Sequence, residues 1–591
     1  MADSLSFRGY LQGYPNTHSD VFWDSAYWDE MLRARADEGF TAIVWYGPNE
    51  STNGQHMLVR HRQFPEAREL TVEENDRIIA HWQSIFARAH QYGLENYLLT
   101  QHIFVTEAFA QHHGLLNAGP VSPTVSHWQG QGYPNFWPRP GDGAVHHCGV
   151  RNELTRAYTQ AVYSELAATY PALDGFWGYA GEPLPGDRST FFREAIQPAL
   201  AAADRPLRFV ANQWQIPLDG FLAHVLPGTT ATQLWLGFHG YNSEQITDAA
   251  PYPGVLRWSA ATGLPTVPDI YPANQLYFPF NSPRFAHEMV AQIRQNSGLA
   301  GFLYYERHIS GSILGPLFRQ ALARYSRRFE PYASDPWVAI LVEQVGNETA
   351  ARYLLQAYDA CARVVPETCA LVYSGGDVMR RELRMPYEFF AADFPWSWAT
   401  SPARGHKLVP IGAYARMVAR APEHFTGDGS DLTQPPFYQH PLWGSEGGSV
   451  YNTTPIEHMR GVRVLGAAAL AAADSALHYA SWGREALAET RDVMEGVALL
   501  SAYYEEKVGA AIAALVYGHS GRAADREAAE AAADRALAAY LAAGEFMHQR
   551  LDPYYQRISG APLTEAGVRL PELIEAERRD RAEIGTIFGW D

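Results

Sequence analysis

The first half of the chain alternates between short apolar or aromatic runs and longer amphipathic stretches. Each run leads into a polar loop rich in Gly, Pro or Asn, which is the pattern of a strand followed by a turn. The eight runs begin at Ser6, Phe40, Asn96, Leu173, Leu207, Thr232, Pro265 and Ala300. Eight strands that alternate with helices predict an α/β fold, a (β/α)8 barrel over 1–328, with a doubly wound open sheet as the alternative.

The stretches between the runs have the spacing and the ends of amphipathic helices. Thr71 is followed three residues later by Glu74, the pattern of a capping box, and Gly93 is a plausible C-cap of the same helix. A helix of similar character ends at Gly39, and another is stopped by Pro171. These boundaries place helices between the predicted strands.

The alternation stops near Pro336, and Ala-rich helical sequence follows. The segment ETAARYLLQAYDACARVV and the stretch 459–554 both predict helices, the latter with tracts such as REAAEAAADRALAAYLAAG. We therefore expect a mainly α-helical domain over 329–591. The many small apolar side chains on the surface of these helices favour a homodimer through this region. The alternative is that the helices pack on each other and on the barrel.

One long insertion interrupts the barrel pattern after the third predicted strand. Residues from about Phe109 to Val150 are rich in Gly, Pro, His and Trp. An insertion of this length in a barrel loop is typical of a lid or of a wall of a substrate site.

Composition excludes several classes of protein. The 591 residues carry a formal net charge of -18, which argues against a general binder of nucleic acid or of anionic membranes. The chain has two lysines, Lys407 and Lys507, and neither has the context of a phosphate-binding loop. No lysine lies in the first 406 residues, so a Schiff-base lysine in the predicted barrel is excluded as well.

The three cysteines and the start of the chain limit the location of the protein. Cys148, Cys361 and Cys369 do not form a disulfide framework, although a Cys361–Cys369 bridge stays open. No apolar run is long enough to span a membrane. The start MADSLSFRGYLQGYP has no signal-peptide pattern, so either the protein is cytoplasmic or a signal was removed.

Motifs for cofactors and metals are weak. No GxSxG elbow and no GxGxxG after a strand is present. The neighbours His112-His113 and His146-His147-Cys148 offer good ligand types, but adjacent residues rarely converge on one ion. We expect no cofactor and no metal.

Active sites of these barrels lie at the carboxyl ends of the strands, so the residues at those ends are the candidates. Aromatic rings there could stack on sugar rings, although each ring alone could equally be a core residue. The aromatic candidates for substrate binding are Tyr46, Trp177, Tyr179, Trp214, Trp235, Tyr271 and Tyr305. The polar candidates are Glu50, His102, Gln213, His239 and Arg307.

Carboxylates at the same ends suggest cleavage of a glycosidic bond, which needs an acid and, on the other face of the sugar, a base or nucleophile. Glu182 is the preferred acid, because burial among aromatic residues raises the pKa of a carboxyl group. Its alternative role is a structural pair with an arginine. For the partner we rank Asp269 first, Glu306 second and Glu50 third.

The sequence Trp177-Gly-Tyr-Ala-Gly-Glu-Pro183 resembles the strand-four Asn-Glu-Pro signature of clan A glycoside hydrolases. The resemblance implies that Glu182 is the acid/base. Gly181 stands where that signature has Asn, and the seventh strand offers Asp269 where those enzymes carry a nucleophilic Glu. These two departures favour inversion over the retaining mechanism of the clan.

Residues 145–190 also resemble the α-glucuronidases of glycoside hydrolase family 67. The likeness lies in the order of His147-Cys148-Gly149, Tyr170-Pro171, Asp174-Gly175-Phe176 and Glu182-Pro-Leu-Pro-Gly186. It implies Glu182 as general acid and a helical region used for dimerisation. The sandwich domain that precedes the barrel in that family has no counterpart here.

We therefore expect an O-glycosidase that acts on an oligosaccharide. Arg60, Arg62, Arg151 and Arg307 could receive the carboxylate of a uronic acid, or could form salt bridges at the rim. One alternative is a metal-dependent sugar isomerase or epimerase that uses the same carboxylates with His239. The other is a non-catalytic carbohydrate-binding barrel.

Overall fold

The computed structural model describes most of the chain in segments. These are residues 4–13, 20–46, 57–68, 70–101, 104–114, 145–147, 153–179, 188–214, 216–227, 233–241, 249–251, 253–270, 281–305, 316–371, 455–559 and 570–583. No helix within these segments is both long and apolar enough to cross a membrane.

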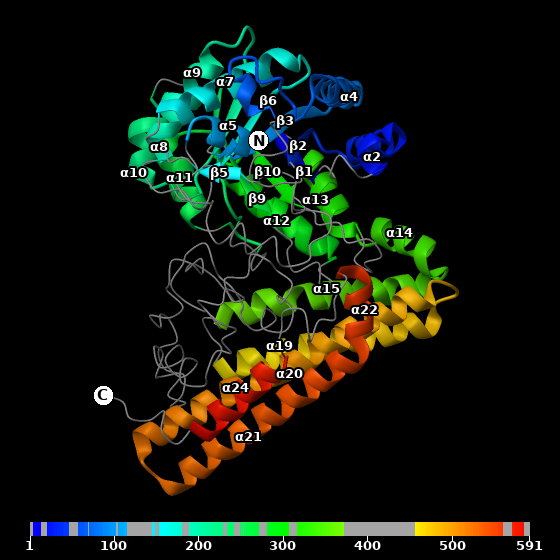
Figure 1. Ribbon diagram of the computed structural model, residues 1–591. Coiled ribbons are helices and arrows are strands. Elements are labelled where there is room, and N and C mark those ends of the chain that lie inside the picture. Colours follow the sequence, from blue (N-terminus) through cyan, green and yellow to red (C-terminus); the bar gives the residue numbers. More distant parts are fainter. Residues whose placement is uncertain are drawn as a thin grey trace.

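Eight parallel strands close into a barrel at one end of the molecule (Figure 1). The strands are β1 (Phe7–Gly13), β2 (Ala42–Tyr46), β3 (Glu95–Gln101), β6 (Gly175–Tyr179), β7 (Arg208–Asn212), β8 (Leu234–Phe238), β9 (Thr266–Ile270) and β10 (Gly301–Tyr305). Each pairs with the next along the chain, and β1 pairs with β10 to close the ring. All eight apolar runs form strands, so the predicted (β/α)8 barrel is confirmed.

Helices cover the outside of the barrel between the strands. They are α1 (Asp20–Trp23), α2 (Ser25–Glu38), α4 (Val72–Gln91), α7 (Glu153–Thr169), α8 (Arg188–Phe191), α9 (Gln197–Ala201), α10 (Leu218–Gly220), α11 (Pro253–Thr262), α12 (Pro283–Gln295) and α13 (Leu317–Arg327), with the helical turns η1 (Pro65–Ala67), η3 (Phe192–Ile196) and η4 (Phe221–Val225). Thr71 and Glu74 form the predicted capping box at the start of α4. Gly39 ends α2 in the left-handed conformation, at φ 104°.

Side chains fill the barrel in layers, because alternate residues of a strand face opposite sides. An inner cluster contains Phe7, Val44, Trp177, Val210 and Val267. At the amino ends of the strands, Arg208 pairs with Glu95 at 2.9 Å and its guanidinium lies over Trp235. The carboxyl ends of the strands, which form the mouth in this fold, lie at the other end of the barrel.

A small antiparallel sheet lies in the long insertion after β3. It pairs β4 (Phe104–Thr106) with β5 (Val145–His147), and α5 (Glu107–His112) follows β4 directly. The sequence predicted a lid or a wall of a substrate site here. Three-residue strands give no readable alternation, so the pattern could not have revealed them.

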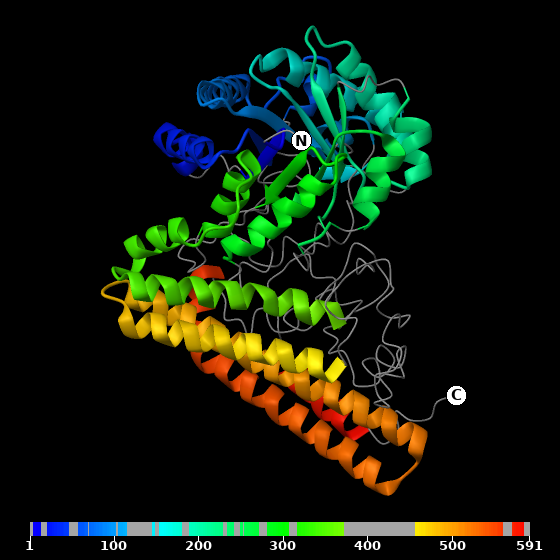
Figure 2. The ribbon, with the colours of Figure 1, turned by 180° about the vertical axis from the view of Figure 1, so that it is seen from behind.

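The other end of the molecule is a bundle of long helices (Figure 2). It contains α14 (Asp335–Val345), α15 (Glu348–Leu371), α19 (Pro455–Tyr479), α20 (Arg484–Ser520), α21 (Ala523–Phe546), η8 (Met547–Leu551), α22 (Asp552–Ser559) and α24 (Leu570–Glu583). Each long helix packs on the next, from α15 through α21. The helical region is confirmed.

Many alanines of these helices are buried inside the chain itself. Ala473, Ala511, Ala514 and Ala536 are fully buried between neighbouring helices. The homodimer stays a prediction, because part of the small apolar surface that suggested it is used within one chain.

The two ends of the molecule are joined by polar contacts and by a shared core. The Ser282 hydroxyl, at the start of α12, donates to Asp359 of α15 at 2.5 Å, and Arg363 of α15 pairs with Glu288 of α12 at 2.8 Å. One continuous cluster of buried apolar residues runs through the barrel's outer shell and the bundle, from Leu5 to Tyr554. The expected boundary between 328 and 329 falls between α13 and α14.

Cys361 lies in this shared core as a free, buried cysteine. The Cys361–Cys369 bridge that the sequence left open is therefore absent.

Candidate active site at the barrel mouth

Asp269 forms the centre of a polar cluster at the carboxyl end of β9. It lies two residues after Val267, which faces the barrel interior, so its side chain points inward as well. The side chain is 0% exposed. Asn212 Nδ2 donates to Asp269 Oδ2 at 3.2 Å, and His239 Nδ1 lies 3.5 Å from the same oxygen. A buried carboxylate is thus held between an amide and an imidazole.

The backbone around the cluster fixes its orientation. Asn212 is the last residue of β7, and its Oδ1 accepts a hydrogen bond from the Trp214 backbone at 2.9 Å. This contact turns the Asn212 amide nitrogen toward Asp269. The Tyr241 backbone N–H, just after β8, donates to the Asp269 carbonyl at 2.7 Å. The ends of β7, β8 and β9 are therefore tied together around the carboxylate.

His239 is the more accessible member of the pair. It directly follows β8, its side chain is 13% exposed, and its ring lies 4.1 Å from the ring of Trp214, centre to centre. When Nδ1 carries the proton and faces Asp269, Nε2 is the acceptor nitrogen of the ring. The imidazole can bind a hydroxyl group, while Trp214, which is buried, supports the imidazole ring from one side.

Other predicted residues also lie at this end of the barrel. Tyr46 and Tyr305 are the last residues of β2 and β10, and both are partly exposed. Gln213 is buried next to Asn212, and its backbone N–H donates to the Gly237 carbonyl at 3.0 Å. Tyr179 is the last residue of β6. The structure thus brings these strand ends into one ring.

Two predicted aromatic residues lie inside the barrel rather than at its mouth. Trp177 is the middle residue of β6, is fully buried, and contacts Phe7 at 5.9 Å between ring centres. Trp235 is the second residue of β8 and lies between Phe7 and the guanidinium of Arg208. The sequence placed both at strand ends. An apolar run does not show where along the barrel axis each of its residues lies, and these two fill the interior.

Several candidates lie outside the described residues. They are Glu50, His102, Glu182, Tyr271, Glu306, Arg307 and Arg151. Among the arginines suggested for a sugar carboxylate, the Arg60 guanidinium is paired with Asp76, as expected of a salt bridge at the rim.

Sequence reasoning missed Asn212. Its signal was available, because Asn at the end of the buried run LRFVAN is a polar residue at a strand's carboxyl end. Within the described part of the chain, no third His, Cys, Asp or Glu joins Asp269 and His239 to form a group of metal ligands.

Comparison with known proteins shows likeness in fold. No family model matches the sequence, and no curated protein matches it. A solved structure described as a GH138 enzyme targeting pectin rhamnogalacturonan II has a TM-score of 0.70 and 14% identity, covering 99% of this chain and 84% of that one.

Two further structures match less of the chain. The GH20 β-N-acetylhexosaminidase from Streptomyces coelicolor A3(2) has a TM-score of 0.35 and 11% identity, covering 59% of this chain and 69% of that one. GH5_18 from Bifidobacterium longum subsp. longum has a TM-score of 0.35 and 13% identity, covering 54% of this chain and 79% of that one. The finer likeness to family 67 stays a prediction. The chain's structural neighbours are glycoside hydrolases with (β/α)8 barrels, and its likeness to the GH138 enzyme extends over both the barrel and the helical bundle.

Proposed function

We propose that the protein is a glycoside hydrolase that cleaves an O-glycosidic bond in an oligosaccharide containing a uronic acid. The observation that carries this proposal is the likeness of 99% of the chain to the GH138 enzyme. A cluster of Asn212, His239 and Asp269 at the barrel mouth supports it, because that is where enzymes of this fold bind their substrates.

The uronic acid is proposed on two grounds. The GH138 enzyme targets pectin rhamnogalacturonan II, which contains uronic acids. In this chain Arg307 follows Glu306 directly after β10, and a guanidinium binds a carboxylate with two parallel hydrogen bonds.

Glu182 is the proposed proton donor. It follows the last residue of β6, Tyr179, by three positions, in the segment that resembles the strand-four signature of clan A. In the barrel order, β10 lies directly across the ring from β6, and β9 lies beside β10. A sugar between these ends would present its two faces to Glu182 and to a carboxylate on β9 or β10.

Asp269 and Glu306 are the two candidates for the second carboxylate. Asp269 is fully buried and already bound by Asn212, so its alternative role is to orient His239 toward the sugar. Glu306 directly follows β10. A second carboxylate that acts as a base or nucleophile contacts the sugar, whereas an orienting carboxylate acts through its neighbour.

The experiment is an activity screen of the whole chain on pectic oligosaccharides, aryl glycuronides and neutral aryl glycosides. We expect release of a uronic acid, and about 10²–10⁴-fold lower turnover for Glu182→Gln on unactivated substrates. On an aryl glycoside with a good leaving group, the turnover of Glu182→Gln should fall less, because that leaving group departs without needing a proton from the enzyme. Near wild-type turnover of Glu182→Gln on an unactivated substrate contradicts the assignment.

Two further variants separate the roles of the second carboxylates. Glu306→Gln and Asp269→Asn are compared for kcat and for the anomer of the first product by NMR. If the substituted residue is the base or nucleophile, its variant has a lower kcat on every substrate. If Asp269 instead orients His239, Asp269→Asn shifts the pH profile of the reaction. Glu95→Gln is the matched control, since Glu95 lies within the same barrel at the opposite end. Loss of turnover on adding a chelator favours the isomerase, and binding without turnover favours the non-catalytic barrel.

A further inference from the structure

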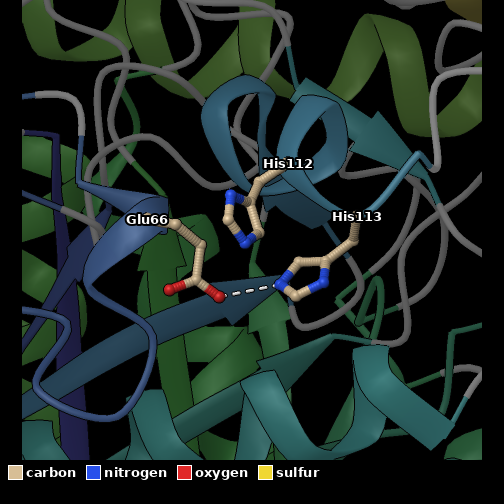
Figure 3. Close-up of side chains that lie close together, drawn as sticks. All are labelled: Glu66, His112 and His113. Atoms are coloured by element: carbon tan, nitrogen blue, oxygen red, sulfur yellow. Dashed lines mark hydrogen bonds and ion pairs between the residues drawn. The ribbon is translucent and has the colours of Figure 1, made fainter.

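Three side chains from two separate loops meet beside the barrel mouth (Figure 3). Glu66 belongs to η1, in the loop after β2. His112 is the last residue of α5, and His113 follows it, in the insertion after β3. His113 Nε2 lies 2.7 Å from Glu66 Oε1, and one ligand atom from each of the three residues lies within 4.8 Å of the others.

The backbone that carries these side chains is held independently of them. Thr106 caps α5 by accepting a hydrogen bond from the Phe109 backbone at 3.2 Å, and its hydroxyl donates to the Ala67 carbonyl at 2.9 Å. Phe64 and Phe109 pack edge to face, with ring centres 5.5 Å apart. The loops of Glu66 and of the two histidines are thus already joined by a cap and an aromatic contact.

We propose that Glu66, His112 and His113 bind one divalent transition-metal ion, of the class of Zn²⁺ or Co²⁺, through one oxygen and two imidazole nitrogens. Bonds of about 2.0–2.1 Å to a tetrahedral ion place ligand atoms roughly 3.3–3.5 Å apart. The Glu66–His113 contact is shorter, at 2.7 Å, and no pair of ligand atoms in the group is more than 4.8 Å apart, so small movements of the side chains reach this geometry. His112 is exposed, so its ring can turn toward the ion without disturbing the core. Two imidazoles and a carboxylate suit these ions better than Mg²⁺ or Ca²⁺, which prefer oxygen ligands.

The second imidazole distinguishes this group from ordinary ion pairs in the same chain. His90 lies 2.7 Å from Asp174, and His548 lies 2.9 Å from Asp552, each as a simple pair. In the described part of the chain, only the Glu66 group brings three ligand atoms together. The pair His112-His113 was visible in the sequence, but adjacent histidines alone rarely share an ion. Glu66 is distant along the chain, so no motif connected it to the two histidines.

The ion would connect the loop after β2 to the insertion after β3, at the side of the barrel that carries the candidate active site. Three protein ligands leave one position on a tetrahedral ion for water or for an oxygen of a bound molecule. The proposal is independent of the proposed hydrolase activity.

The test is Co²⁺ binding to the whole chain, followed by visible absorption, with Zn²⁺ binding measured by equilibrium dialysis. We expect one high-affinity ion per chain and an absorption spectrum of low-symmetry Co²⁺ with nitrogen and oxygen ligands. His112→Gln and Glu66→Gln should each weaken binding at least about tenfold, as loss of a supporting ligand does elsewhere. Both positions are at the surface or partly exposed, and circular dichroism verifies that each variant is folded.

His90→Gln is the matched control, because it removes an exposed histidine that contacts a carboxylate without a second imidazole. It should leave Co²⁺ affinity unchanged. The proposal is overturned if no stoichiometric binding occurs as Co²⁺ is raised in molar excess. It is equally overturned if binding survives unchanged in both His112→Gln and Glu66→Gln.

Discussion

Gly301, the first residue of β10, lies so close to Phe7, the first residue of β1, that a Cβ on Gly301 would be 1.6 Å from the Phe7 carbonyl oxygen. This contact is at the seam where the last strand meets the first. The obstructing atom belongs to the backbone, so a side chain cannot simply move away. Closure of the barrel therefore depends on the absence of a side chain at this position.

Gly301→Ala should destabilise the barrel. One of the two strands must shift, so the loss in free energy of unfolding should reach or exceed the upper end of the ~1–3 kcal/mol typical of overpacked cores. Chemical denaturation measures it. Gly461→Ala is the control, because Gly461 lies on the exposed face of α19 and a Cβ there meets nothing within 4 Å. It should stabilise the chain by roughly 0.5–1 kcal/mol through helix propensity, and equal effects at both positions would contradict the packing argument.

Lys507 and Glu577 form a buried ion pair between α20 and α24. Their side chains are 0% and 2% exposed, with Nζ 2.6 Å from the carboxylate, and the Tyr503 hydroxyl donates to the same oxygen at 3.3 Å. Lys507→Met leaves a buried carboxylate without its lysine, which should cost about 3–5 kcal/mol. Adding Glu577→Gln removes that charge and keeps an acceptor for Tyr503. The double variant should recover most of the loss in urea denaturation, and a double variant as unstable as the single one refutes this account.

His81 should make stability depend on pH in the weakly acidic range. Burial lowers the pKa of His81, a hydrogen bond to the Phe22 carbonyl opposes this, and Arg77 lowers the pKa further. The folded state therefore binds a proton less readily than the unfolded state as the pH falls through about 6.5. The contribution of the neutral His81 ring to the free energy of unfolding is present above that pH. It is lost as the pH falls toward the lower pKa of the folded state.

The measurement for His81 is the free energy of unfolding between about pH 7 and pH 5. Wild type should lose more stability over this range than His81→Gln, whose amide can still donate to the Phe22 carbonyl. NMR titration of the His81 ring in the folded protein should give a pKa below 6.5. An unshifted or raised value would contradict the prediction.

Cys361 should be chemically inert in the folded protein. It is fully buried, so reagents in solution do not reach it. Burial also raises the pKa of its thiol, which disfavours the reactive thiolate. Peptide mapping after iodoacetamide treatment should find Cys361 unmodified in the native sample and modified after unfolding in urea. Rapid native modification of Cys361 would show that the core around α15 opens readily.

The barrel could be predicted because its signal is repeated and local. Each apolar run from Ser6 to Ala300 ends in turn-forming residues, and capping signals such as Thr71 with Glu74 mark the helices between them. The depth of a side chain along the barrel axis is not local, since it depends on the shear of the whole ring. This is why Trp177 and Trp235 were expected at the mouth and instead lie inside.

The candidate site was predictable only in part, for a related reason. Asp269 and His239 could be chosen because each ends an apolar run. Their contact through one oxygen, and the role of Asn212 in fixing it, arise from neighbouring strands that only the folded barrel brings together. The approach of Glu66 to His113 depends likewise on two loops packing through Thr106 and Ala67.

One cluster of buried apolar residues contains side chains of both the barrel and the bundle, from Leu5 to Tyr554, so we expect the two parts to unfold together. Cutting the chain between α13 and α14 would strip α12 of Asp359 and Arg363 and would expose apolar side chains on both pieces. Heat should therefore melt both ends in one calorimetric transition. Neither half could have been exchanged for another module during evolution without rebuilding the face that the two halves share.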